Sequence, residues 1–306
     1  MSRITFKEAS RLWMADKARH VKVTSLAAYS LMIRTHLEPR FYFLEDITPE
    51  SVQKLVDDKL AAGVGATTVR GIIQLLKTIV RFCENKRWIG ERRYEVYIPK
   101  RKVKPDPKVL PMDDEKRLLR CLVNDPKGSN IGLLICLCCG LRIGEVCALK
   151  WEDVDFQRGV IHIRRTVHRI YDPGASARMS ALTIGLPKTG NSEREIPIPV
   201  FLARILDKEY SPSAPDSYIL TRKTTPMDPQ TFRYNFYKVT NNLGIPPRKV
   251  HSLRHTFATR CLESKCDVKT LSVLLGHSDV STTLNLYVHP GLEQKRRCVE
   301  DMMKLL

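Results

Sequence analysis

The stretch IGLLICLCCGLRIGEVCALKWEDVDF, residues 131–156, decides how the second half of this chain folds. It begins with eleven apolar or small residues that end at Leu141, directly before Arg142. A membrane-spanning helix needs roughly 18 or more such residues, so the run predicts a buried helix, Ile131 to Cys139, and excludes an integral membrane protein. Gly140 has the place of a helix C-cap. A new helix is expected from Arg142, carrying Glu145 and Leu149.

Three of the nine cysteines, Cys136, Cys138 and Cys139, lie in this apolar run. Buried cysteine behaves as a small apolar residue, so we interpret them as reduced core thiols of a cytoplasmic protein. A zinc site needs a second ligand cluster at finger-like spacing, which we do not find in the sequence. We therefore expect no metal and no cofactor, and the N-terminus shows no secretory signal.

Basic residues exceed acidic residues in both halves of the chain. Lys and Arg number 51 and Asp and Glu number 33, which gives a net charge of +18 over 306 residues. Residues 1–104 hold 21 basic and 11 acidic residues, and the remainder hold 30 and 22. A protein that neutralises phosphates releases condensed counterions, so this excess indicates a polyanionic partner for both halves.

A proline-rich basic segment, PKRKVKPDPKVLP at 99–111, divides the chain. Four prolines and five Lys or Arg favour an extended, solvated linker. We therefore expect one domain over residues 1–98 and a second over 112–306. Capping residues and apolar repeats predict four helices in the first domain. Their expected spans are Thr5 to Arg19, Thr24 to Leu37, Thr48 to Ala62 and Thr67 to Arg87.

The second domain is expected to be mainly α with a small antiparallel β-sheet. Three short runs of β-branched residues predict a three-stranded sheet, and LPKTGNSERE (186–195) predicts a hairpin turn. The runs lie at 160–163, 183–184 and 196–198. Besides the two helices around Gly140, the predicted helices are Met112 to Asn124, Gln230 to Asn242, Ser252 to Ser264, Val268 to Leu275, Ser281 to Val288 and a tail helix, 292–306.

Six polar residues of the second domain form a set that suits a phosphodiester. They are two arginines, a lysine, two histidines and a tyrosine: Arg142, Lys188, His251, Arg254, His277 and Tyr287. Attack on phosphorus places extra negative charge on the non-bridging oxygens, and two guanidinium forks match those oxygens. The set contains no carboxylate cluster, so a mechanism built on it needs no metal.

Four segments of the second domain resemble the motifs of the tyrosine recombinase, or phage integrase, family. They are GLRIGEVCALKWEDVDF (140–156), PKTGNSEREIPIP (187–199), HSLRHTFATR (251–260) and LLGHSDVSTTLNLYVH (274–289). Their order and spacing match over about 150 residues, which is more specific than one short motif. The resemblance implies that the four N-terminal helices form the family's core-binding domain, which binds DNA. It also implies that a tyrosine hydroxyl attacks a DNA phosphate, giving a 3′-phosphotyrosine and a free 5′-hydroxyl.

The resemblance implies roles for the polar residues. Arg142 and Arg254 match the family's two phosphate-clamping arginines. His277 matches a residue that hydrogen-bonds the phosphate, and Glu145 matches a family acidic position that we interpret as a positioning partner of Arg142. His255 also belongs to the family pattern, and we interpret it as structural.

Three further matches concern the transferred protons and the nucleophile. Tyr287 matches the nucleophile, Lys188 the lysine that protonates the departing 5′-oxygen, and His251 the general acid/base. Ionising a tyrosine at pH 7 costs about 4 kcal/mol, so the hydroxyl needs the help of neighbouring groups.

The particular role within the family stays open between several alternatives. Tyr287 lies ten positions after His277, which favours an integrase of a mobile element over an Xer-type recombinase that resolves chromosome dimers. The absence of an arm-binding domain before the helical bundle points to the Xer type. A type IB topoisomerase and a DNA-binding protein without activity are weaker alternatives. The resemblance further implies a specific double-stranded DNA site, a synaptic tetramer on that DNA and a nucleoid location. The apolar side of tail 292–306 would dock in trans on a neighbouring protomer or cover its own core.

Overall fold

The structure is a computed structural model that describes residues 4–99, 109–171, 180–185, 193–210 and 214–287, with positions 296, 300, 302 and 303. Lys188, with most of the predicted hairpin turn and tail helix, lies outside the described residues. The described elements belong to two compact units. No helix within the described ranges is long and apolar enough to cross a bilayer.

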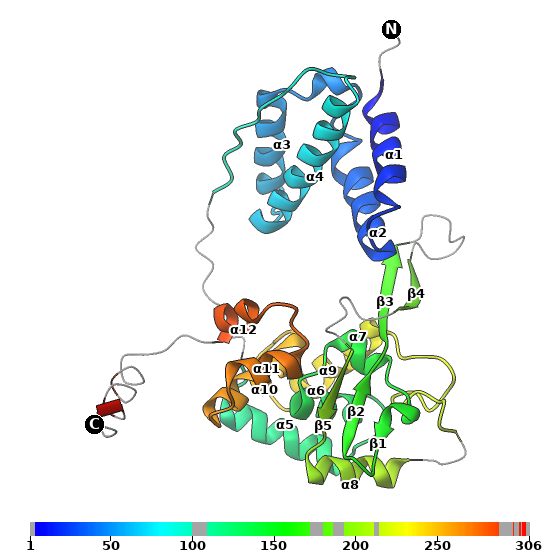
Figure 1. The fold of residues 1–306 in the computed structure, drawn as a ribbon, viewed down its shortest axis with the longest axis vertical. Coiled ribbons are helices and arrows are strands. Elements are labelled where there is room, and N and C mark those ends of the chain that lie inside the picture. Colours follow the sequence, from blue (N-terminus) through cyan, green and yellow to red (C-terminus); the bar gives the residue numbers. More distant parts are fainter. Residues whose placement is uncertain are drawn as a thin grey trace. The chain divides into compact units, whose positions relative to one another are not determined.

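The first unit is a helical bundle around one apolar core (Figure 1). Its helices are α1 (Phe6–Lys17), α2 (Val23–Met32), α3 (Pro49–Ala61) and α4 (Ala66–Asn85). All four match predicted helices, although the predicted second helix changes after Met32 to a π-helical turn, Ile33–Leu37. The Thr5 and Thr48 hydroxyls accept hydrogen bonds from the first turns of α1 and α3, as their cap positions predict.

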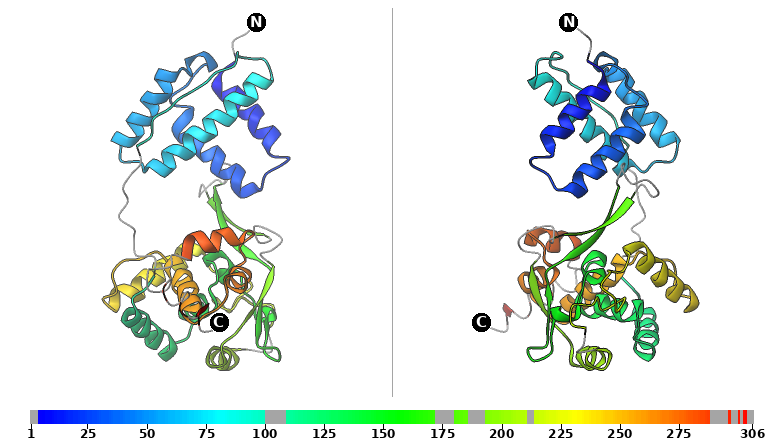
Figure 2. Two further views of the ribbon diagram at one scale, coloured as in Figure 1. Left: turned by 60° about the vertical axis from the view of Figure 1, so that its left-hand side comes forward. Right: turned by 90° about the vertical axis from the view of Figure 1, so that its right-hand side faces the viewer.

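Helix α4 forms the centre of this bundle, because one full face of it is apolar. It packs against both α1 and α3 (Figure 2). The buried face repeats at three- and four-residue intervals, as the sequence predicts. It contains Ala66, Val69, Ile72, Ile73, Leu75, Leu76, Ile79, Val80 and Cys83.

The second unit is built around α6 (Ser129–Cys139), which contains most of the apolar run 131–141. Nearly every residue of α6 is buried, and it contacts helices on all sides. These are α5 (Met112–Asn124), α7 (Ile143–Cys147), α8 (Val200–Glu209), α9 (Pro229–Asn242) and α10 (His251–Glu263). Burial raises the pKa of Cys138 to about 12 and suppresses its thiolate. Cys136, Cys138 and Cys139 are free thiols, as expected.

Two short helices complete the unit beside α10. They are α11 (Val268–Leu275) and α12 (Val280–Tyr287), and α11 contacts both α10 and α12 (Figures 1 and 2). Asp267 caps the first turn of α11 through its side chain, and Gly276 ends the helix in the left-handed conformation. Helix α8 is the one long helix of this unit, within the described ranges, that has no counterpart among the predicted helices.

The predicted three-stranded sheet exists, but one predicted strand of it is wrong. Strands β1 (Val154–Asp155), β2 (Val160–Ile163) and β5 (Arg194–Pro197) pair antiparallel in the order β1-β2-β5. The run at 183–184 belongs to β4 (Ser180–Gly185), which pairs with β3 (Thr166–Tyr171) in a separate two-stranded sheet. Burial explains the difference: Ile161 and Ile163 of β2 face the core, whereas Ile184 is 47% exposed. β-branched residues therefore indicated a strand at 183–184 but not its partner.

Candidate active site

The C-terminal end of α11 gathers three arginines from three different elements. Arg194 of β5 donates from Nε to the Leu274 carbonyl at 2.7 Å. Arg254 of α10 donates to the next carbonyl, that of Leu275. Arg142, the N-cap of α7, donates to the carbonyl of Gly276 at 3.1 Å. The last carbonyls of a helix have no partner within it and carry its negative dipole end, so they attract cations.

A buried carboxylate, Glu145, joins two of these arginines. Its Oε1 accepts from Arg142 Nη1 at 2.8 Å, and its Oε2 accepts from the Arg142 backbone N–H at 2.9 Å. Both carboxylate oxygens also accept from Arg194, at 3.1 and 2.9 Å. Burial alone would raise the pKa of Glu145. The hydrogen bonds and charges of the two arginines outweigh burial and lower this pKa to about 2. Glu145 is therefore ionised at neutral pH.

Arg254 is almost completely buried, with 1% of its surface exposed. Nη1 donates to the Gly140 carbonyl at 2.8 Å, and Nη2 lies 3.1 Å from His277 Nε2. Burial and the positive charge of Arg142 lower the pKa of Arg254 to about 9, so the group still carries its charge at pH 7. No carboxylate bonds to it in the described structure. Its direct hydrogen bonds to protein oxygens are with carbonyl groups, and the charge of Glu145 acts on it without a direct contact, so Arg254 is able to bind an anion.

The hydrogen bonds of His277 define its tautomer. Burial and the charge of Arg254 lower its pKa to about 4, so the ring is neutral at pH 7. Arginine can only donate, so Nε2 of His277 accepts from Arg254. The proton then lies on Nδ1 and is donated to Thr283 Oγ1 at 2.8 Å. A direct hydrogen bond from His277 to a phosphate, as the resemblance implies, requires the proton to be on Nε2 instead.

Tyr287, at the end of α12, belongs to this cluster. Burial raises the pKa of its hydroxyl, and the charges of Arg254 and Arg142 offset part of that effect. The ring of His255 packs against the rings of both Tyr287 and His251, with centroid distances of 5.4 Å and 4.6 Å. The pKa of His251 is lowered because protein displaces water around it and because Arg254 and Arg142 are positive. His251 is therefore neutral at pH 7 and able to accept a proton.

Five of the six candidate residues thus lie in one connected cluster: Arg142, His251, Arg254, His277 and Tyr287. Lys188 lies outside the described residues. Three contacting residues were given no role in the chemistry from sequence: Arg194, His255 and Thr283. Arg194 and His255 lie within the segments that resemble the family motifs. Their position beside the candidate residues was the only indication in the sequence that they belong to the site. Three guanidinium groups against one carboxylate leave two excess positive charges beside a tyrosine hydroxyl, which suits a phosphodiester oxyanion.

Two constraints require a glycine at position 140, where α6 ends and where the backbone carbonyl accepts a hydrogen bond from Arg254. The φ of Gly140 is +68°, and a Cβ there would lie 2.4 Å from the ring of Phe257. We expect Gly140→Ala to lower the free energy of unfolding by about 1–2 kcal/mol for the left-handed backbone and about 1–3 kcal/mol more for the overlap. Urea unfolding measures this.

Gly159→Ala is the matched control for this prediction. Gly159 has a similar φ of +64°, but its Cβ would meet nothing within 4 Å. It is therefore expected to show the backbone cost without the overlap. Equal losses of stability in the two variants would contradict the packing described around Gly140.

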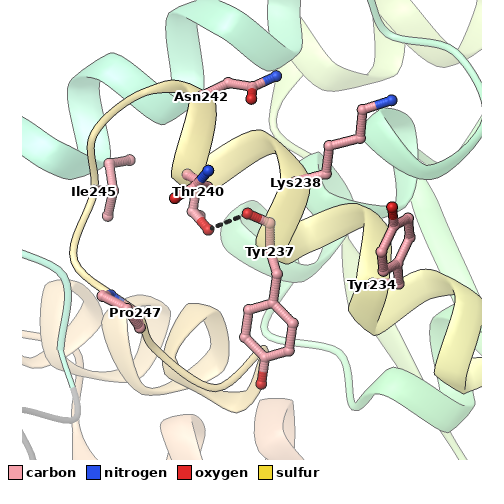
Figure 3. Close-up of a pocket in the computed structure, with 8 residues that line it drawn as sticks. Tyr234, Tyr237, Lys238, Thr240, Asn242, Ile245 and Pro247 are labelled. Atoms are coloured by element: carbon pink, nitrogen blue, oxygen red, sulfur yellow. Dashed lines mark hydrogen bonds between the residues drawn. The ribbon is translucent and has the colours of Figure 1, made fainter.

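A pocket elsewhere in the second unit involves none of the five clustered residues. Its volume is about 410 Å³, and it lies between α9 and the segment that follows it (Figure 3). Tyr234, Tyr237 and Lys238 line it from the helix, and Ile245 and Pro247 line it from the segment. The cationic cluster is thus separate from this pocket. Among the described residues, no group of three or more His, Cys, Asp or Glu could hold a metal ion.

Comparison with known families assigns both units. The model of the phage integrase family matches residues 108–293. The model of the phage integrase N-terminal SAM-like domain matches residues 5–60. The chain therefore belongs to the phage integrase family. Membership implies the breaking and rejoining of DNA.

Individual relatives are distant but cover most of the chain. A tyrosine recombinase XerC-like protein of Caldanaerobacter subterraneus subsp. tengcongensis is 27% identical over 278 residues, 83% of this chain and 70% of the relative. Tyrosine recombinase XerD of Pseudomonas aeruginosa is 27% identical over 290 residues, 91% of this chain and 89% of the relative.

Solved structures share the fold. The Tn1549 transposon integrase, in complex with transposon right end DNA, matches with a TM-score of 0.79 at 19% identity. The match covers 98% of this chain and 100% of that one. A lambda integrase tetramer bound to a Holliday junction matches with a TM-score of 0.67 at 18% identity, covering 94% of this chain and 78% of that one.

Proposed function

We propose that this protein is a site-specific DNA recombinase that cleaves and rejoins DNA through a covalent bond between Tyr287 and a 3′-phosphate. One observation carries the proposal: Arg142 and Arg254 are held side by side on the carbonyls at the end of α11, and the Tyr287 ring packs against His255 in the same cluster. Tyrosine is a weak nucleophile at neutral pH, and adjacent cations and a base are what activates it.

The proposed reaction begins with attack of the Tyr287 oxygen on the scissile phosphorus. The hydroxyl proton leaves to a base, for which neutral His251 is the candidate, directly or through the ring of His255. Arg142 and Arg254 stabilise the negative charge that develops on the non-bridging oxygens. The bond to the 5′-oxygen breaks, that oxygen takes a proton, and the free 5′-hydroxyl of another strand later reverses the step.

Lys188 is the proposed donor of the proton to the departing 5′-oxygen. A bridging 5′-phosphorothiolate leaves as a thiolate and needs no such proton. Lys188→Ala is therefore expected to cleave the sulfur-containing strand about 10²–10⁴-fold faster than the ordinary strand, the range that a general acid supplies. Arg142→Ala should be slow on both strands, because it stabilises the phosphorane. If sulfur does not rescue Lys188→Ala, the donor is another group, with His251 the next candidate.

For the biological role we propose integration of a mobile element, with Xer-type resolution of dimers as the alternative. The position of Tyr287, ten positions after His277, favours the integrase. The partners proposed are a specific double-stranded DNA site, bound by both units, and three further copies of the chain in a synaptic tetramer. Strand exchange in the nucleoid of the cytoplasm is the corresponding location.

Two assays on the unmutated protein test this function. The first is covalent attachment to labelled genomic fragments that contain the DNA flanking the gene, in excess EDTA, because no step proposed uses a metal. The second is strand exchange between two such fragments, which a topoisomerase does not perform. Absence of any covalent product would favour a DNA-binding protein, and a product without exchange would favour a topoisomerase.

A further inference from the structure

We propose that Arg194 is a positioning residue of the strand-cleaving site: it holds Glu145, and through Glu145 it orients Arg142 against the C-terminal end of α11. The chemical role of Arg142 rests on the function proposed above. The placement of Arg194 does not depend on it. The family resemblance gives Arg194 no role, and its hydrogen bonds to Glu145 and Leu274 place it behind Arg142.

The side chain of Arg194 is buried and forms hydrogen bonds to Glu145 and to the end of α11. Its two terminal nitrogens each bond to an oxygen of Glu145, and Nε bonds to the Leu274 carbonyl. Its side chain and that of Glu145 are each 3% exposed, whereas Arg142 is 35% exposed. A bidentate guanidinium with that burial is directed at Glu145, while the more exposed Arg142 is the one that reaches substrate.

The backbone at Gly276 packs closely against the guanidinium group of Arg194. A Cβ at Gly276 would lie 3.0 Å from Arg194 Nη1 and 3.1 Å from its Cδ, so the turn after α11 closes directly on this side chain. β5 also contacts α11. Gly276 is the residue whose carbonyl holds Arg142, and His277 follows it. Arg142 is held by two partners, Glu145 and the C-terminal end of α11. The side chain of Arg194 contacts both of these partners.

Removal of Arg194 leaves Glu145 buried with less compensation. The charged and titratable groups that act on this carboxyl come from four different parts of the second unit. They are Arg142 before α7, Arg194 on β5, Arg254 on α10 and Cys136 on α6. Without Arg194, the cost of burying the charge rises and the carboxyl takes up a proton at a higher pH. A neutral Glu145 no longer holds Arg142 by an ion pair.

The test compares single-turnover cleavage by Arg194→Met, Glu145→Gln and the double variant between pH 5.5 and 8. We expect Arg194→Met to cleave about 10–100-fold more slowly at pH 7.5, as is typical when a supporting residue of a site is removed, and to lose further rate as the pH falls. The unmutated protein should show no such acid loss from Glu145. The double variant should be no slower than Glu145→Gln, because both changes break one support.

Two variants separate positioning from simple loss of stability. Arg158→Met removes another bidentate Arg–Glu pair, with Glu195, that is exposed on the same sheet. It should leave both the rate and its pH dependence unchanged. Arg194→Lys keeps the positive charge but not the fork. It should restore cleavage at acid pH and only part of the rate at pH 7.5, and it replaces Arg194→Met in the comparison if that variant does not fold.

A readout without DNA keeps this inference separate from the proposed function. The ¹³C shift of the Glu145 carboxyl should stay that of a carboxylate down to pH 4 in the unmutated protein and titrate above pH 4 in the Arg194 variant. The positioning role would be overturned if the cleavage rates of Arg194→Met and the unmutated protein changed in the same way with pH. It would also be overturned if the rate losses of the two single variants multiplied in the double variant. A carboxyl that titrates identically with and without Arg194 would overturn it even if the protein proves not to cleave DNA.

Discussion

Tyr287→Phe is expected to bind its DNA site with nearly unchanged affinity and to form no covalent adduct. The substitution removes one oxygen and leaves the ring, which packs against the cluster of Ala258, Leu271 and Leu275. Binding depends on contacts of basic residues with phosphates, which the change does not touch. We therefore expect Tyr287→Phe to lose the cleavage step and to keep its affinity for DNA. Gel-shift titration and a denaturing gel on the same samples measure the two quantities.

Tyr234→Phe and Tyr237→Phe are the matched controls for this prediction. Both tyrosines lie on α9 beside the pocket of Figure 3, and both are exposed. Each control should form adducts at the unmutated rate. An adduct that survives in Tyr287→Phe, or one that disappears in a control, would move the nucleophile to another of the ten tyrosines.

Arg254→Lys is expected to slow cleavage by about 10²–10³-fold, the cost of losing one preorganised donor at a developing oxyanion. The planar guanidinium reaches two carbonyls, those of Gly140 and Leu275, while it contacts His277. A single ammonium cannot reproduce this geometry, although it keeps the charge. Stability should also fall by about 1–3 kcal/mol, because one buried carbonyl loses its partner. The rate is measured in single turnover at a temperature where circular dichroism shows the variant folded.

Arg260→Lys provides the control, because Arg260 lies on the same helix and bonds to Glu115 and the Leu110 carbonyl instead. It should lose stability without a specific loss of cleavage rate. Cleavage by Arg254→Lys within about tenfold of the unmutated rate, less than one lost donor costs, would show that charge alone suffices. The planar geometry of the Arg254 guanidinium would then make no contribution to catalysis.

Much of the fold could be predicted from local patterns. The apolar residues of α4 repeat on one helical face, and those of α6 form one continuous run. Each pattern is best buried as a helix, so both helices could be predicted from the sequence. The pairing of strands could not be predicted in this way. Thr183 and Ile184 are β-branched, like residues in the runs of the core sheet, yet β4 pairs with β3. Which strand joins which depends on side-chain burial across the unit, and no short segment contains that information.

The site could be predicted as a set of residues but not as a network. Motif spacing selected Arg142, Arg254, His277 and Tyr287, and these lie in one cluster. Motif spacing does not show that the end of α11 holds three arginines, because that contact joins β5, α7 and α10, which are far apart in sequence. Arg194 is the residue most affected. The role proposed for Arg194 depends on its two hydrogen bonds to Glu145, which form only when the chain has folded.

The most direct test of the central claim is to identify the residue that becomes attached to DNA. The unmutated protein is reacted in excess EDTA with a duplex that carries the recombination site and a nick that traps the cleaved strand. The adduct is digested, and the nucleotide-linked peptide is sequenced by mass spectrometry. The account predicts one modified residue, Tyr287, carrying a 3′-phosphate-linked nucleotide. A linkage to any other residue, or an adduct that forms only with a divalent metal, would contradict it.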